Sequence, residues 1–173
     1  MSGLDAAGMQ FETVEQLRTL QVKDTEVQQL VLAHGAGTSD QTCVELVRIA
    51  HGRHQLFASG EAVAGLIDAG LQESSLIELA RLDQLGLWAG EAQAMRLAGV
   101  SDQVIIEVAR RRAAGQSTLS GSRIAALRNF GLPDRQLVAE IQRGTTDAQA
   151  DQMIARRNAL VGHSFVRQRG RRR

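Results

Sequence analysis

The spacing of apolar residues predicts a series of short amphipathic helices. Between residues 12 and 160, apolar residues recur three and four positions apart, which places them on one face of an α-helix. The alternation of β-branched and polar residues that is typical of strands is missing, and so are Asn-Gly hairpin turns. We expect about ten helices, near residues 12–20, 24–34, 39–50, 60–69, 73–83, 89–98, 102–113, 120–130, 134–143 and 146–160.

A sequence pattern centred on Gly70, Gly99 and Gly131 recurs along the chain. An apolar residue lies seven and four positions before each glycine and another follows it directly. An acidic residue comes three positions after the glycine, and an apolar pair comes six and seven positions after it. Two weaker copies lie upstream, one with Gln21 in place of the glycine and one centred on Gly37. The residues of the three clear copies are Val63, Leu66, Leu71, Glu73, Leu76 and Ile77; Ala92, Met95, Val100, Asp102, Ile105 and Ile106; and Ile124, Leu127, Leu132, Asp134, Leu137 and Val138.

Each copy predicts a pair of helices joined by a tight turn. A glycine in the left-handed conformation closes a helix C-terminus, and an acidic residue in the next first turn favours the helix dipole. Pro133 fits the first position of its helix, where the missing N–H would be unpaired in any case. Helices of about ten residues are marginal in water, so packing between neighbours must supply the stability. We therefore predict an all-α array or compact bundle of helical hairpins.

The predicted organisation has three parts. Residues 1–10 are expected to be a flexible N-terminus and residues 11–160 a helical-hairpin repeat domain, while residues 161–173 form an extended, basic, Arg-rich tail. The N-terminus lacks the basic and then apolar run of a signal peptide, and no apolar stretch is long enough to span a membrane. A cytoplasmic location is therefore predicted.

The glycine turns partly resemble the helix-hairpin-helix DNA-binding motif, in which hydrophobe-Gly-hydrophobe-Gly joins two helices and backbone N–H groups hold a phosphate. The first glycine and the hydrophobe after it match at all three turns. Gln72, Ser101 and Pro133 stand where that motif has its second glycine, and an acid follows each turn. Since carboxylates repel phosphate, we interpret these turns as structural.

Charge is divided unequally between the body and the C-terminus. The chain has 20 Lys and Arg and 19 Asp and Glu, of which residues 156–173 hold seven arginines and no acid. Residues 1–155 therefore carry 13 basic and 19 acidic residues, a net charge of −6. Such asymmetry favours a polyanionic partner, although the tail could also rest on its own acidic body or on a neighbouring copy. The tail residues predicted to bind a partner or nucleic acid are Arg156, Arg157, Phe165, Arg167, Arg169, Arg171, Arg172 and Arg173.

Two further positions are candidates for contact with a partner. Arg110, Arg111 and Arg112 form a second basic patch, with favourable capping of their own helix C-terminus as the alternative. Trp88 is the only tryptophan, and it is either a buried anchor or an interface hot spot.

Residues able to carry catalysis or bind metal are few. Cys43 falls on the apolar stripe of its helix, which indicates a small core residue. His51 and His54 have a spacing compatible with one metal-binding face, but Gly52 weakens a helix there and no third ligand is near, so a surface loop is favoured. No nucleophile triad, phosphate loop or nucleotide fingerprint is present. We predict that the protein is not an enzyme and has no cofactor or metal.

The leading hypothesis for function is an interaction or assembly subunit of a larger complex, with homo-oligomers as one form of such assembly. Apolar helix faces would dock a protein partner, and the basic arm would anchor the subunit. The alternative is a nucleic-acid-binding protein that contacts phosphates through the arm, which a steep salt dependence would reveal.

Overall fold

The protein is all-helical in the residues that the computed structural model describes, 2–86 and 88–170. Within those ranges it has eleven helices and no strand, which confirms the predicted fold class. Ten of them correspond to the predicted helices, and one short N-terminal helix is additional. The helices are α1 (Ser2–Ala6), α2 (Phe11–Thr19), α3 (Asp24–Gly35), α4 (Asp40–Gly52), α5 (Gly60–Asp68), α6 (Glu73–Arg81), α7 (Ala89–Leu97), α8 (Asp102–Ala113), α9 (Gly121–Asn129), α10 (Asp134–Arg143) and α11 (Asp147–Gly170).

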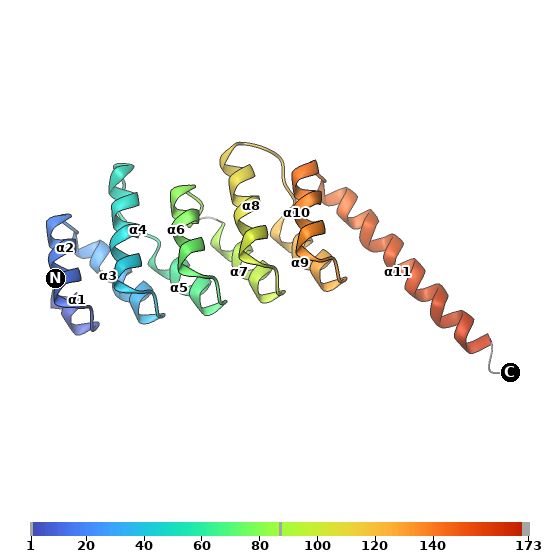
Figure 1. Ribbon diagram of the computed structural model, residues 1–173, viewed down its shortest axis with the longest axis horizontal. Helices are drawn as coiled ribbons and strands as arrows, with labels where there is room; N and C mark the ends of the chain where they lie inside the picture. The colour runs from blue at the N-terminus through green and yellow to red at the C-terminus, as the bar shows by residue number, and fades with distance from the viewer. Residues whose placement is uncertain (1, 87, 171–173) are drawn as a thin grey trace.

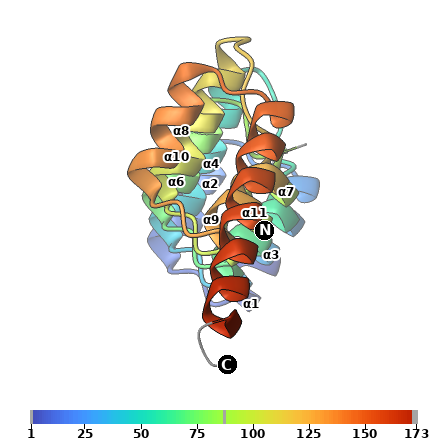
Figure 2. The same cartoon turned by 90° about the vertical axis from the view of Figure 1, so that its right-hand side faces the viewer.

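The helices stack in a line and do not close into a globular bundle. Each helix contacts only its neighbours in sequence and the helices two places away. The odd-numbered helices form one layer and the even-numbered helices the other (Figure 2). The N- and C-termini consequently lie at opposite ends of an elongated array (Figure 1). Contacts restricted to adjacent repeats are the defining property of a solenoid.

The core of the array consists of the apolar positions of the repeat. Residues seven and four places before the turn glycines, such as Val63 and Leu66, are at most 1% exposed. The residue after each glycine is also buried, as Leu71, Val100 and Leu132 show. Each helix has one apolar face, and this face is shielded from water only when the neighbouring hairpins pack against it.

All ten turns that follow α1 to α10 contain a residue with positive φ. The first helix of each hairpin is followed by a glycine, Gly8, Gly37, Gly70, Gly99 or Gly131, with φ between 77° and 100°. After the second helices the residues are Gln21, His54, Asp83, Gly115 and Gly144. At Gly70 the turn has the Schellman pattern, because the Leu71 N–H donates to the Leu66 carbonyl at 2.9 Å and the Gly70 N–H to Ile67 at 2.8 Å. Gln21 therefore follows the second helix of the first hairpin. The turn glycine between the two helices of that hairpin is Gly8.

Backbone conformation at these turns makes a testable contribution to stability. Gly99→Ala is expected to lower the free energy of unfolding by about 1 kcal/mol, because φ is 77° and no atom lies within 4 Å of the added Cβ. Gln21→Gly, at φ 56°, is expected to raise it by up to about 1 kcal/mol. Urea unfolding of both variants would measure this. Shifts of the same sign would contradict the account.

In three hairpins the acidic residue of the repeat, Asp40, Glu73 or Asp102, links its hairpin to the preceding one. The backbone N–H of Gln10 donates to Asp40 at 2.8 Å, that of Ser39 to Glu73 at 2.7 Å, and that of Gln72 to Asp102 at 2.9 Å. Each carboxylate thus binds the N–H two residues after the previous turn glycine. The acid was predicted to favour its own helix dipole, but the tertiary structure also gives it this second role.

The outer faces of the two end hairpins are polar where inner hairpins are apolar. One position of the repeat holds a buried apolar residue in the inner hairpins, namely Leu46, Leu79 and Val108. In α10 the same position is occupied by Glu140, and the Arg143 guanidinium lies 2.6 Å from its carboxylate. At the other end, Glu15 and Arg18 pair with each other on α2. Polar outer faces at terminal repeats prevent the array from stacking indiscriminately on apolar surfaces.

Both ends of the described chain are more helical than the sequence suggested. α1 lies inside residues 1–10, the predicted flexible segment, and Leu4 is fully buried beside α3. The backbone of α11 continues to Gly170, beyond the predicted helix end at 160 and into the segment expected to be extended. This segment contains no proline, which would otherwise interrupt a helix. α11 projects away from the rest of the array (Figure 1).

Candidate functional site

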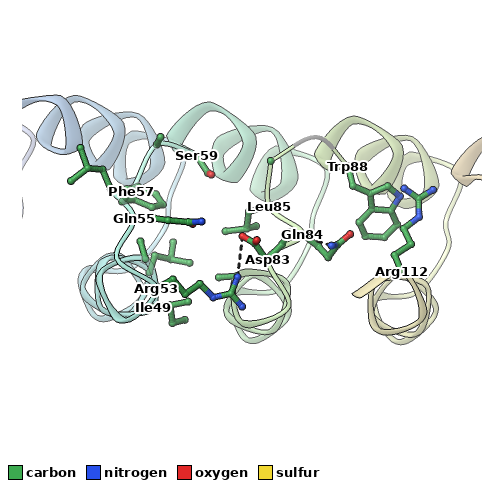
Figure 3. Close-up of a pocket in the computed structure, with 16 residues that line it drawn as sticks. Ile49, Arg53, Gln55, Phe57, Ser59, Asp83, Gln84, Leu85, Trp88 and Arg112 are labelled. Carbon is green, nitrogen blue, oxygen red and sulfur yellow. Dashed lines mark hydrogen bonds and ion pairs between the residues drawn. The ribbon is translucent and has the colours of Figure 1, made fainter. Parts of the chain in front are cut away.

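The main candidate site is a cavity of about 440 Å³ on one edge of the array. It lies between the loop that joins α4 to α5 and the loop that joins α6 to α7 (Figure 3). Its apolar wall includes Leu46, Ile49, Phe57, Leu85 and Trp88. Polar side chains, Arg53, Gln55, Asp83 and Gln84, line it as well. A cavity with an apolar wall and a few polar groups is the usual form of a binding pocket.

An ion pair crosses the cavity from one loop to the other. The Arg53 guanidinium lies 3.0 Å from the Asp83 carboxylate, and it also donates to the Arg81 carbonyl (Figure 3). Asp83 has φ of 61°, and His54, beside Arg53, has φ of 58°. The pair therefore joins two loops whose tight turns use the left-handed region without glycine, a conformation that costs a non-glycine residue energy.

Glu26, on α3, fixes the position of the α4–α5 loop through hydrogen bonds. This glutamate is fully buried, and its carboxylate accepts from the Phe57 N–H at 2.8 Å and the Lys23 N–H at 3.1 Å, with the His51 Nε2 at 2.9 Å. Burial by itself would raise the pKa of Glu26, but the hydrogen bonds from Phe57, Lys23 and His51 outweigh it and leave the pKa below its ordinary value. The loop is thus tied to α3 and α4 by a charged, buried acceptor.

Trp88 forms the far wall of the cavity. It is 3% exposed, so the ring is an internal anchor in this structure, the first of the two roles expected of it. The Arg112 guanidinium lies over the ring, 5.1 Å from its centre. The Glu91 carboxylate accepts from Trp88 Nε1 at 3.3 Å, Arg112 at 2.8 Å and the Gly121 N–H at 2.7 Å. This cluster joins α7, α8 and α9.

Two of the three arginines of the predicted secondary patch contact other hairpins. Arg110 Nε lies 2.9 Å from the Glu78 carboxylate, and Arg111 donates to the Gln142 carbonyl at 3.2 Å. Arg112 belongs to the Trp88 cluster. Arg110 and Arg111 therefore link neighbouring hairpins, whereas Arg112 binds Glu91 within its own hairpin.

The structure describes part of the predicted basic tail. Arg156 and Arg157 are exposed on α11, and the Arg157 guanidinium lies near the Gly131 turn. Phe165, Arg167 and Arg169 belong to the helical backbone of α11, but their side chains lie outside the described part, as do Arg171, Arg172 and Arg173 entirely.

The remaining chemical candidates have structural roles. Cys43 is fully buried, and burial, followed by the nearby charges of Asp40 and Glu73, raises the pKa of its thiol to about 12. His51 binds Glu26, and no group of three or more potential metal ligands occurs among the described residues. The turn amides of Gln10, Ser39 and Gln72, which a phosphate would need, already bind carboxylates of the following hairpins.

Several residues that shape this site gave no recognisable signal in the sequence. Glu26 lies in the first turn of a helix, where an acid is ordinarily exposed. Gly60 and Gly121 begin α5 and α9, and their N–H groups donate to Gln29 at 2.8 Å and Glu91 at 2.7 Å. These partners lie 31 and 30 residues earlier, about one repeat length. Alignment of successive repeats is therefore the one feature of the sequence that could have indicated these contacts.

The fold is a linear array of α-helical hairpins with a cavity on one edge. No protein-family model matches the chain, and no curated protein or solved structure is significantly similar to it. No helix in residues 2–86 or 88–170 has both the length and the apolar character needed to cross a membrane.

Proposed function

We propose that the protein is a non-enzymatic interaction subunit that docks a protein partner along the array and is anchored by its basic C-terminal arm. The observation that carries this proposal is the linear stack itself, in which hairpins contact only their neighbours. Such arrays expose an extended surface, and binding along it is their characteristic use.

The α4–α5 loop is the best candidate for the docking contact. Leu56 in this loop is 45% exposed and lines the cavity, while the polar groups beside it can orient a bound segment. The Glu26 hydrogen bonds hold this loop, so it can present its apolar residue with little loss of conformational entropy on binding.

A capture experiment from native lysate tests this role. Leu56→Arg should reduce recovery of the partner at least about tenfold, because it places a charge at the apolar contact. Leu32→Arg is the matched control, since Leu32 is 43% exposed but lies on α3, away from the cavity. Equal capture by the two variants, or capture that nuclease treatment abolishes, would refute docking at the cavity.

Nucleic-acid binding is the second candidate function, favoured by the seven arginines and absence of acids in residues 156–173. Arginine contacts to phosphate release counterions, so affinity should fall steeply with salt. Replacing Arg167, Arg169 and Arg171 with glutamine should flatten that salt dependence. Binding to an oligonucleotide with no salt dependence would contradict this alternative.

A further inference from the structure

We infer that the basic arm of one copy binds an acidic groove on the N-terminal hairpins of a second copy, in a head-to-tail contact. This inference rests on the proposed anchoring role of the arm and names the partner. It follows from how charge is distributed along the linear array.

The two halves of the chain have opposite charge. Residues 1–83 contain 12 acidic and 5 basic residues, a net of −7, so residues 84–173 contain 7 acidic and 15 basic residues, a net of +8. Because the hairpins stack in chain order, this division becomes a separation in space, with an acidic end at α1–α6 and a basic end at α11 (Figure 1).

The arm cannot neutralise the acidic end of its own molecule. α11 contacts α9 in the odd layer, four helices of that layer (α3, α5, α7 and α9) lie between it and α1, and adjacent packed helices lie about 8–10 Å apart. α11 also points away from the array over 24 residues, about 36 Å of helix. The sequence left open whether the tail rests on its own body or on a neighbour, and this geometry favours a neighbour.

The acidic end carries a groove that suits arginine side chains. A hollow of about 590 Å³ runs over α2, α4 and α6. Apart from its charged residues, its lining is largely polar and includes Gln10, Gln16 and Gln41. Arg81 is paired with Glu45 at 3.0 Å, and Asp40 and Glu73 accept from the turn amides of Gln10 and Ser39. Glu12 is exposed and has no ion pair within the described residues. The charged residues that line it are Glu12, Asp40, Glu45 and Glu73, with Arg48 and Arg81.

Arginine and carboxylate are well matched for this contact. A guanidinium presents several donors in a fixed plane and can bind a carboxylate through two of them, and glutamine carbonyls accept as well. Single exposed ion pairs contribute at most about 1 kcal/mol, so several must act together. The association should therefore weaken strongly as salt screens the charges.

The contact joins different surfaces of the two copies. Such a heterologous interface does not saturate both molecules of a dimer, because each dimer keeps one free arm and one free groove. The purified protein should consequently form species larger than dimers as its concentration rises.

Sedimentation velocity of nuclease-treated, full-length protein tests the inference. At about 50 mM NaCl the wild type should show concentration-dependent oligomers, and at about 500 mM it should be monomeric. An arm variant, with Arg167, Arg169, Arg171, Arg172 and Arg173 replaced by glutamine, should be monomeric at both salt concentrations.

A groove variant with a matched control locates the binding surface. Glu12→Arg with Gln16→Arg changes the groove and should weaken association at least about tenfold. Gln103→Arg with Glu107→Arg adds the same charge at the same two repeat positions of α8, outside the groove, and should leave association within about twofold. Equal weakening by the two double variants would refute the groove.

A mixing experiment distinguishes a head-to-tail contact from other oligomers. The arm variant retains its groove and the groove variant retains its arm, so the two monomeric proteins should form a 1:1 heterodimer and nothing larger. A wild type that is monomeric at about 50 mM NaCl, or a mixture that stays monomeric, would overturn the inference. Because no lysate partner is involved, that result would leave the docking test at Leu56 to decide the proposed function independently.

Discussion

Gly60→Ala is expected to lower the free energy of unfolding by about 3 kcal/mol or more, the upper end of the cost of overpacking. A Cβ at this position would lie 2.1 Å from the carbonyl oxygen and 2.7 Å from the Cα of Gln29. These are backbone atoms of α3, so the clash can be relieved only by separating α3 from α5, which pack side by side. Such a separation would also break the hydrogen bond from the Gly60 N–H to Gln29.

The control for this prediction is Gly90→Ala on α7. Gly90 also lies in the first turn of a helix in the odd layer, but no atom lies within 4 Å of its added Cβ. Alanine there should stabilise the protein by about 0.5–1 kcal/mol, because it restricts the unfolded chain and favours the helix. Denaturant titration of both variants measures the difference. A Gly60→Ala protein as stable as the wild type would show that α3 and α5 are not packed this closely.

Glu26→Gln is expected to cost about 2–3 kcal/mol at neutral pH, although it changes one atom. The two Glu26 oxygens accept from Phe57, Lys23 and His51, and an amide nitrogen in either place would face a backbone N–H donor. Glu61→Gln, at an exposed position in the first turn of α5, should change stability by less than about 0.5 kcal/mol. A cost below 1 kcal/mol for Glu26→Gln would refute the structural role of this carboxylate.

The same residue predicts a pH dependence of a definite sign. The pKa of Glu26 is lower in the folded protein than its ordinary value of 4.5, so the unfolded chain binds the proton more readily. Its stabilisation is therefore present above about pH 4.5 and is lost as the pH falls through the lower, folded pKa. The difference in stability between wild type and Glu26→Gln should shrink over that acid range. A difference that is constant down to pH 3 would contradict the assignment.

Glu73 adds to this acid sensitivity with the same sign. Burial would raise the pKa of Glu73, but hydrogen bonds from the Ser39 hydroxyl, Thr42 and the Ser39 N–H leave it lowered. Glu26→Gln should consequently reduce the acid sensitivity and not abolish it.

The local elements of the fold were predictable because their causes are local in sequence. A period of three to four apolar residues indicates a helix, and a glycine after the last apolar position indicates its end. Leu66, Met95 and Leu127, which this spacing places on the apolar face, are at most 1% exposed for that reason. The sequence pattern predicts that Gln21 lies in the turn within a hairpin, but Gln21 lies between two hairpins, after α2 and before α3.

The site was less predictable, because its residues meet through contacts 21 to 31 residues apart in the sequence. Phe57 binds Glu26 across 31 residues and Arg112 meets Glu91 across 21, and neither pair has a local sequence signature. The three arginines at 110–112 are equally basic in the sequence, yet each contacts a different part of the stack.

The sequence alone determined that this protein is a set of helical hairpins with an acidic body and a basic C-terminus, because periodicity, turn glycines and charge are properties of the residues themselves. Only the tertiary structure decided that the hairpins form a line, since both a line and a globule bury the same apolar stripes. The line is fixed by contacts between neighbouring units, such as Gly60 against Gln29 and the turn amide of Ser39 on Glu73. It is this linear order that turns a division of charge along the chain into opposite charges at the two ends of the molecule.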